Sequence, residues 1–443
     1  MIGGITINKI QIVALSCILL FITPSIQTQK TDNNSVIFVD DDNTLGPWDG
    51  SIEHPFFFIQ DAINAAIPYD TIFIFNGIYY ENIIIKTSIS LIGEEKENTI
   101  IDGDNRGGVI SVEDGNSILI TNFTIQHGID TTEKRGYGIS SNTSNDVRII
   151  SNIITNNEDG IIIQKKSQYC LIIQNEIVGN ELGFDLCTST NNLIYENKFI
   201  DNTLGLILFN SSNNCILKNI FDNGEKHIKF YNSYDTIYNN YWGKSRRIFF
   251  IFGYKSLFGT NLIIPWIRCD FKPARSIDAI ESNPLAIMDT TKGKMIFELY
   301  SSKTPVTVQN FISLSNIDFY ENIVFHRVID DFVIQGGGYY SNGTDVESPL
   351  GTIDLEIHPE VRHEDGAISM ARTNDPNSAT SQFFICDGKQ THLDDNYAAF
   401  GTLLVGFSVL RAIASVETET KYGFMKDWPV DNIEINWIDI LNK

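Results

Sequence analysis

The residues most able to do chemistry lie in the last third of the chain. The segment FHRVIDDFVIQGGG (residues 325–338) contains Arg327 and Gln335, which are an even number of positions apart. Side chains at even spacing on an extended strand point to the same face, so we expect both to line one groove. An arginine is a permanently charged, planar set of N–H donors. A fixed donor of this kind can be aimed at an amide without any metal or cofactor.

A second segment, GAISMARTNDPNSATSQFFICDG (residues 366–388), follows about forty residues later. Together the two segments resemble the cyclophilins, and the resemblance extends from Pro284 to Lys443. It implies an eight-stranded antiparallel barrel closed by two helices, with the active groove on its outer face. It also implies catalysis of rotation about the peptide bond before proline, whose barrier of about 18–20 kcal/mol makes the uncatalysed step slow. The implied partners are proline-containing polypeptides.

The resemblance assigns roles to individual residues of this groove. Arg327 becomes the catalytic guanidinium, and Gln335 orients the substrate carbonyl and holds Arg327 in place. A donor near the prolyl nitrogen stabilises the twisted amide more than the planar one, which lowers the barrier. The resemblance places the proline pocket at Phe332, Val333, Phe384, Leu393 and Tyr397, a second glutamine at Gln382, backbone contacts at Ala371 and Arg372, and His392 where many eukaryotic members have tryptophan.

The elements that must position these residues can be read from the flanking sequence. LAIMDTTKGKMIFELY predicts two strands around a turn at residues 292–294, and TPVTVQNFISLSN has helical spacing. The late segment FGTLLVGFSVLRAIASVET predicts a strand, a glycine turn and a helix. His326 neighbours Arg327 and so points to the opposite face, which makes a structural role the better interpretation.

The middle of the chain repeats itself every 21 to 23 residues between residues 140 and 240. Each unit predicts two or three short strands separated by Asn and Gly corners, and stacked units form a solenoid. Aligned asparagines are then expected to hydrogen-bond from coil to coil. The equivalent positions are Asn152, Asn175, Asn197, Asn219 and Asn240, then Asn156, Asn180, Asn202 and Asn223, with glycines at Gly138, Gly160, Gly183 and Gly205.

This half resembles β-helix repeat proteins, a group that includes periplasmic copper-insertion factors and carbohydrate-processing lyases. We therefore expect a mainly β chain of two domains, a right-handed parallel β-helix and then the cyclophilin-like barrel. The boundaries are an export signal or N-terminal anchor at 1–28, the β-helix at 29–243, a C-terminal cap and linker at 244–283 and the isomerase domain at 284–443. The helical spacing of residues 55–67 predicts a cap at the first coil.

Composition and the N-terminal segment indicate which partners and which cellular location to expect. The net charge of −23 and pI near 4.6 oppose a nucleic-acid partner. Lys9 precedes an apolar run at residues 10–26, which is typical of an export signal. The protein is therefore expected outside the cytoplasm or at the cell surface, with membrane contact only through that segment if it is retained. Five cysteines follow it without a CxxC pair, so neither a disulfide framework nor a metal site is predicted.

Two alternatives remain for the β-helix. It is either a spacer for the isomerase or the main functional unit, which would bind a glycan or an envelope polymer and make the isomerase accessory. A polysaccharide lyase or hydrolase would need paired carboxylates on one face. The candidates, Asp40 to Asp42, Asp102 and Asp104, suit turns and caps better.

Overall fold

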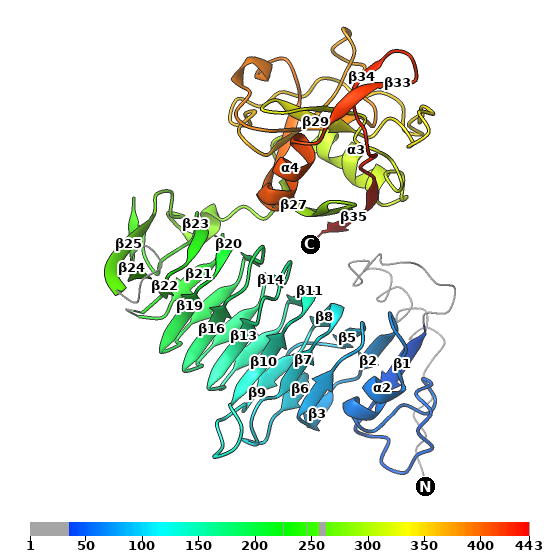
Figure 1. Cartoon of the computed structure of the whole chain (residues 1–443). Coiled ribbons are helices and arrows are strands. Elements are labelled where there is room, and N and C mark those ends of the chain that lie inside the picture. The colour runs from blue at the N-terminus through cyan, green and yellow to red at the C-terminus, as the bar shows by residue number, and fades with distance from the viewer. Residues whose placement is uncertain (1–34, 225, 246, 257–262, 443) are drawn as a thin grey trace. The chain divides into compact units, whose positions relative to one another are not determined.

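The computed structural model describes residues 35–442 except 225, 246 and 257–262 (Figure 1). The chain divides between Ser282 and Asn283 into two compact units, each described here by itself. The predicted export segment lies outside the described residues. Within the described parts of the chain, no helix is long and apolar enough to cross a membrane.

The first unit is a parallel β-helix of three long sheets that run along the stack (Figure 1). One sheet contains β1 (Val36–Val39), β2 (Thr71–Ile74), β5 (Ser90–Gly93), β8 (Asn116–Thr121), β11 (Asn145–Ile150), β14 (Leu171–Ile173), β17 (Leu193–Tyr195), β20 (Ser212–Leu217) and β23 (Tyr234–Tyr238). The second contains β3 (Gly77–Tyr80), β6 (Thr99–Asp102), β9 (Thr124–Gln126), β12 (Ile153–Thr155), β15 (Glu176–Val178), β18 (Lys198–Ile200) and β21 (Ile220–Asp222). The third contains β4 (Ile83–Ile85), β7 (Ile110–Glu113), β10 (Tyr137–Asn142), β13 (Asp159–Gln164), β16 (Leu182–Cys187), β19 (Leu204–Phe209), β22 (Ile228–Tyr231), β24 (Phe249–Ser256) and β25 (Ile263–Asp270).

The core of this unit is built from identical side chains stacked coil on coil. Ile149, Ile172, Ile194 and Ile216 are aligned partners on successive strands of the first sheet, and all are fully buried. No single coil can bury its apolar face alone, so this stacking provides the core that the 22-residue repeat predicted. The predicted right-handed β-helix is confirmed.

Buried asparagines form the expected ladders at the corners. Asn197 is typical, because its Nδ2 donates to Asn219 Oδ1 at 3.0 Å while its Oδ1 accepts from the backbone and side chain of Asn175. The second ladder begins at Asn157, not at the predicted Asn156, whose φ of 54° places it in a left-handed turn. Adjacent asparagines are indistinguishable by spacing alone, which explains the one-residue error.

Two of the ladders end on a carboxylate, whereas the buried Nδ2 of Asn223, at the end of the ladder from Asn157, has no hydrogen-bond partner among the described residues. Asp270 accepts from the backbone N–H of Asn239 and Asn240 and from the indole of Trp242. A third ladder, through Asn192 and Asn214, ends in the same way at Asp235. A carboxylate suits the last position because it only accepts hydrogen bonds. Burial raises the pKa of the Asp270 carboxyl, and the donated hydrogen bonds oppose that rise.

The repeated glycines are required by close approach and not by turn geometry. A Cβ on Gly160 would lie 2.5 Å from the carbonyl oxygen of Gly183, and one on Gly183 would lie 2.5 Å from that of Gly205. Neither position has a positive φ. The prediction of tight corners at these glycines is wrong, since they lie where neighbouring coils touch.

Both ends of the β-helix carry extra elements. Helix α2 (Ile59–Ala65) is shorter than predicted and packs against the first coils, with Glu81 accepting from its first two backbone N–H groups. At the other end, the segment predicted as a cap and linker forms the antiparallel hairpin β24–β25, which extends the third sheet beyond β22. Trp242 and Phe249 stack at 4.1 Å and close the core there. The short helix η1 (Ile277–Ala279) follows.

The second unit is an eight-stranded antiparallel sheet with two helices, as predicted. Its strands, in sheet order, are β28 (Arg327–Ile329), β29 (Val333–Gly336), β31 (Phe383–Cys386), β30 (Ala367–Met370), β32 (Ala399–Val405), β27 (Gly293–Leu299), β26 (Leu285–Thr290) and β35 (Ile435–Leu441). Backbone hydrogen bonds from Ile435 to Ile323 and from Phe325 to Ile433 join the two ends into a barrel. The helices are α3 (Pro305–Ser315) and α4 (Phe407–Ala414), and the smaller elements are η2 (Thr391–Leu393), β33 (Thr418–Lys421) and β34 (Met425–Pro429).

Candidate active site

The candidate site lies on the outer face of this barrel, where β28, β29 and β31 lie side by side. Arg327 pairs with Gln335, and Gln335 pairs with Phe384, so the three residues form one row across three strands. Directly opposed residues share a face of a sheet. Residues 325–338 do not form the single extended strand that their alternation predicts, because the chain turns at residues 330–332. Arg327 and Gln335 therefore meet across a hairpin.

Alternation along these strands separates the site from the barrel core. Val328, Ile334 and Ile385 point inward and belong to the main core. A second cluster on the outer face consists of Val333, Ala367, Phe384, Cys386 and Leu393, with Phe332, Ala371 and Tyr397 packed against it. All five residues assigned to the proline pocket belong to this outer cluster. A separate apolar cluster outside a barrel core can hold an apolar ring.

Aromatic contacts fix the walls of the outer cluster. Phe384 and Tyr397 meet edge to face at 5.7 Å, and Phe332 stacks on His392 at 5.6 Å. Leu393 lies in the short helix η2 and is nearly buried. These residues come from separate loops and strands, so the outer cluster depends on the fold of the whole barrel.

Gln335 of the row is held by a second glutamine, Gln382, which directly precedes β31. Gln335 Nε2 donates to Gln382 Oε1 at 3.0 Å. The backbone at Gly338 makes room for this pair, because a Cβ there would lie 2.5 Å from Gln382 Nε2. Gln335 was expected to hold Arg327, but the hydrogen bond that the structure contains joins it to Gln382.

Arg327 keeps part of its guanidinium available to a ligand. Its side chain is 38% exposed, and its Nε lies 3.8 Å from Asp427 Oδ2 on β34. Its Cζ lies 5.8 Å from the centre of the Phe332 ring. An exposed ion pair at this distance contributes little stability, so a substrate carbonyl can compete for the guanidinium.

The loop after β30 presents backbone groups beside the pocket. The Ala371 N–H donates to the carbonyl of Gln382 at 2.9 Å. The Arg372 side chain turns away from the row, since its Nε and Nη2 donate to the carbonyl of Asn396 and its Cζ lies 4.7 Å over the Tyr397 ring. Arg372 therefore packs on Tyr397 at the outer cluster.

One supporting network was not found from the sequence. His363 is buried behind Phe384, with Nδ1 2.9 Å from Asp394 and Nε2 3.0 Å from Ser369 Oγ. Burial lowers the pKa of the His363 imidazole, and the Asp394 carboxylate opposes this effect. Asp394 directly follows Leu393, but its pairing with a histidine 31 residues away leaves no local signal.

His326 points away from the site, as expected from its position. It is buried against the edge of Tyr339, at 4.7 Å between ring centres. Burial lowers the pKa of its imidazole to about 4, and the neighbouring Arg327 charge adds to this effect. The histidine is therefore neutral in the folded protein at neutral pH.

This histidine predicts a specific dependence of stability on pH. Its pKa is lower in the folded state than in the unfolded state, so acid protonates the unfolded chain first and destabilises the fold. Between pH 7.5 and 5 we expect His326 to cost about 2 kcal/mol of the free energy of unfolding. Denaturant titrations followed by Trp428 fluorescence, with wild type and His326→Gln, measure the difference. Equal pH slopes for the two proteins would show that His326 does not titrate this way.

Comparison with known proteins agrees with this geometry. Residues 285–439 match the family model described as cyclophilin type peptidyl-prolyl cis-trans isomerase, and residues 63–251 match that of the periplasmic copper-binding protein NosD. A peptidyl-prolyl cis-trans isomerase of Acinetobacter baylyi is 37% identical over 164 residues, which are 36% of this chain and 86% of that protein. The Streptomyces antibioticus isomerase cyp18 is 36% identical over 35% of this chain and 96% of its own length. A crystal structure of a Cryptosporidium parvum cyclophilin is 34% identical, covers 37% of this chain and 99% of its own, and has a TM-score of 0.34.

These matches define an enzyme of the peptidyl-prolyl isomerase class. The chain belongs to the cyclophilin-type peptidyl-prolyl cis-trans isomerases, through its second unit.

The NosD match raises the question of a copper site. Copper favours imidazole and sulfur ligands. Among the described residues, the one group of three His, Cys, Asp or Glu whose ligand atoms converge is Asp330, Asp331 and Asp387, which lies in the other unit. Asp387 there is paired with Arg411 and accepts from the Asp331 N–H. In the described part of residues 63–251, no three His, Cys, Asp or Glu side chains converge in this way.

Proposed function

We propose that the outer row is the catalytic site and that Arg327 drives the isomerisation. The supporting observation is the row itself, in which a half-exposed guanidinium, a hydrogen-bonded glutamine pair and an apolar cluster lie on one face. As the amide before proline twists, it loses resonance and its nitrogen becomes more basic. A fixed cationic donor stabilises this twisted state more than the planar one.

The other residues of the site bind and orient the substrate in this proposal. The proline ring enters the pocket of Phe332, Val333, Phe384, Leu393 and Tyr397. Gln335, held by Gln382, donates to the substrate carbonyl, and backbone groups at Ala371 and Arg372 contact the peptide. His392 stacks on Phe332 at the rim. No metal or cofactor takes part in this chemistry.

The direct test of the function is a protease-coupled isomerisation assay with the full chain. We expect acceleration of cis-to-trans conversion of X-Pro peptides, and a panel that varies the residue before proline will define the preferred substrates. No acceleration with any peptide of the panel would contradict the proposal.

We further propose that the enzyme acts on exported or surface proteins, with the β-helix as a spacer or binding platform. The NosD family is described as periplasmic, which supports export. The buried Asn ladders make the β-helix a rigid body suited to a spacer. Fractionation of cells together with N-terminal sequencing of the purified chain tests export and cleavage near residue 28. Retention in the cytoplasm would contradict it.

The alternative is that the β-helix binds a glycan or an envelope polymer and the isomerase is accessory. A pull-down of the full chain on isolated envelope polymers distinguishes the two roles. Binding that survives loss of isomerase activity would favour the alternative, and no binding would favour the spacer.

A further inference from the structure

The hairpin β24–β25 exposes more large apolar side chains than any other described stretch of its length. Phe252 is 65% exposed and Ile267 is 53% exposed. Others in and beside the hairpin are Ile248, Phe250, Tyr254, Ile263, Trp266 and Phe271. Strand β25 is also an edge strand of the sheet, paired with β24 alone among the described strands. Exposed apolar groups in this density indicate a surface that contacts something else.

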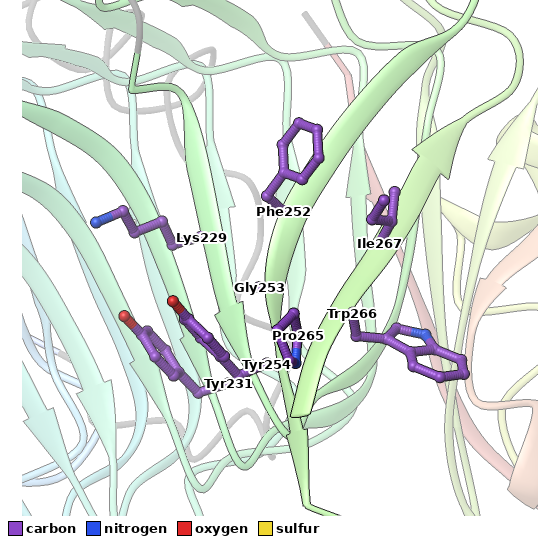
Figure 2. Close-up of a pocket in the computed structure, with 8 residues that line it drawn as sticks. All are labelled: Lys229, Tyr231, Phe252, Gly253, Tyr254, Pro265, Trp266 and Ile267. Carbon is purple, nitrogen blue, oxygen red and sulfur yellow. The ribbon is translucent and has the colours of Figure 1, made fainter. Parts of the chain in front are cut away.

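Register places Phe250, Phe252, Tyr254 and Ile267 on one outer face, whereas Trp266, which pairs with Gly253, lies on the other face. Phe252 pairs with Ile267, and Tyr231, Tyr254 and Pro265 are aligned on successive strands. The Tyr231 and Tyr254 rings stack at 5.5 Å with their hydroxyl groups on the same side (Figure 2). Together with Lys229, these residues line a pocket of about 780 Å³ (Figure 2). The outer face is therefore apolar along the hairpin, and the hydroxyl groups of Tyr231 and Tyr254 and the amino group of Lys229 lie at one side of it.

The same segment is basic in an acidic protein. Residues 244–275 contain seven Lys and Arg residues and one Asp, whereas the chain as a whole carries a net charge of −23. Lys244 and Arg247 precede β24, and Lys272 and Arg275 follow β25, so the antiparallel pairing brings these four exposed residues to the same end of the hairpin. The single acid, Asp270, is buried at the end of an Asn ladder.

We propose that the hairpin β24–β25 docks this protein on the surface of an anionic lipid bilayer. Aromatic and aliphatic side chains of the outer face enter the interfacial region, and the basic end contacts anionic headgroups. A second copy of this acidic chain is the main competing occupant, because it would also complement the basic end. Aromatic and aliphatic side chains beside basic residues favour the bilayer instead. The docking is separate from the N-terminal apolar segment and from isomerase activity.

Hydrogen exchange of the full-length protein tests this docking locally. The probes are vesicles of phosphatidylcholine with phosphatidylglycerol, and vesicles of phosphatidylcholine alone. We expect the β25 amides that point away from β24 to exchange at least fivefold more slowly with the anionic vesicles. Neutral vesicles should change their exchange less than twofold, because the basic end then has no partner.

Matched variants test which residues cause the slower exchange of the β25 amides. Phe252→Ser combined with Ile267→Ser should reduce the slowing to less than twofold. Ile78→Ser combined with Ile84→Ser removes two comparably exposed isoleucines from β3 and β4 and should leave it unchanged.

Four results would overturn the proposal. The first is unchanged exchange with anionic vesicles, and the second is binding to vesicles by the N-terminal segment without protection of β25. The third is slowing that depends on protein concentration alone, which indicates a second copy. The fourth is slowing caused by an added polypeptide and not by vesicles.

Discussion

Arg327→Ala should lower kcat/KM for X-Pro isomerisation about 100- to 1000-fold, the range seen when an enzyme loses a donor aimed at its transition state. The loss should fall mainly on kcat, because the donor interacts more strongly with the twisted amide than with the planar substrate. The substitution should leave the fold intact, since the side chain is half-exposed and its ion pair with Asp427 is long. Protease-coupled kinetics over a range of peptide concentrations separate kcat from KM.

Two further variants sharpen this result. Arg327→Lys keeps the positive charge but loses the planar fork of donors, so we expect an activity between wild type and the alanine variant. Arg106→Ala is a matched control, because Arg106 is also exposed and lies 3.5 Å from Asp104 in the β-helix. Full activity in Arg327→Ala would remove Arg327 from the mechanism and leave the family assignment unaffected.

Much of the barrel site could be predicted because its motifs carry the necessary residues in order. The even spacing within residues 325–338 indicated Arg327 and Gln335, the resemblance to the cyclophilins added Phe384, and the structure places the three in one row. The groups that support them could not be found in this way. Asp427 lies 100 residues from Arg327, and the pairing of His363 with Asp394 depends on two loops meeting in the folded barrel.

The β-helix could be predicted from its period, since stacking of identical residues requires a constant repeat. The period does not fix the local register. It did not show that Asn157, and not Asn156, belongs to the ladder. It also could not provide the hairpin β24–β25, because those residues leave the 22-residue repeat and pair antiparallel. Residues 249–252 are all apolar, so the sequence shows no alternation of apolar and polar residues that would distinguish a strand from a linker.

The asparagine ladder supports the second large prediction, which concerns stability. Asn197 is fully buried, and its side chain also donates to the carbonyls of Ile172 and Tyr195. Asn197→Ala removes these bonds and leaves donors of Asn175 without their acceptor inside the stack. Because buried polar groups are costly when unpaired, we expect a loss on the order of 3–5 kcal/mol of the free energy of unfolding. Urea titration followed by fluorescence of the buried Trp242 measures it.

The direction of the ladder gives this prediction a finer test. Asn197→Asp keeps an acceptor for Asn175 but cannot donate to Asn219 Oδ1, and it places a carboxylate against that oxygen. It should therefore also destabilise the β-helix, even though aspartate occupies the last position of the ladder at Asp270. Asn98→Ala is the control, because Asn98 is exposed and its side chain donates only to Glu95. If Asn197→Ala and Asn98→Ala differed by less than 1 kcal/mol, the ladders would be a consequence of stacking and not a source of stability.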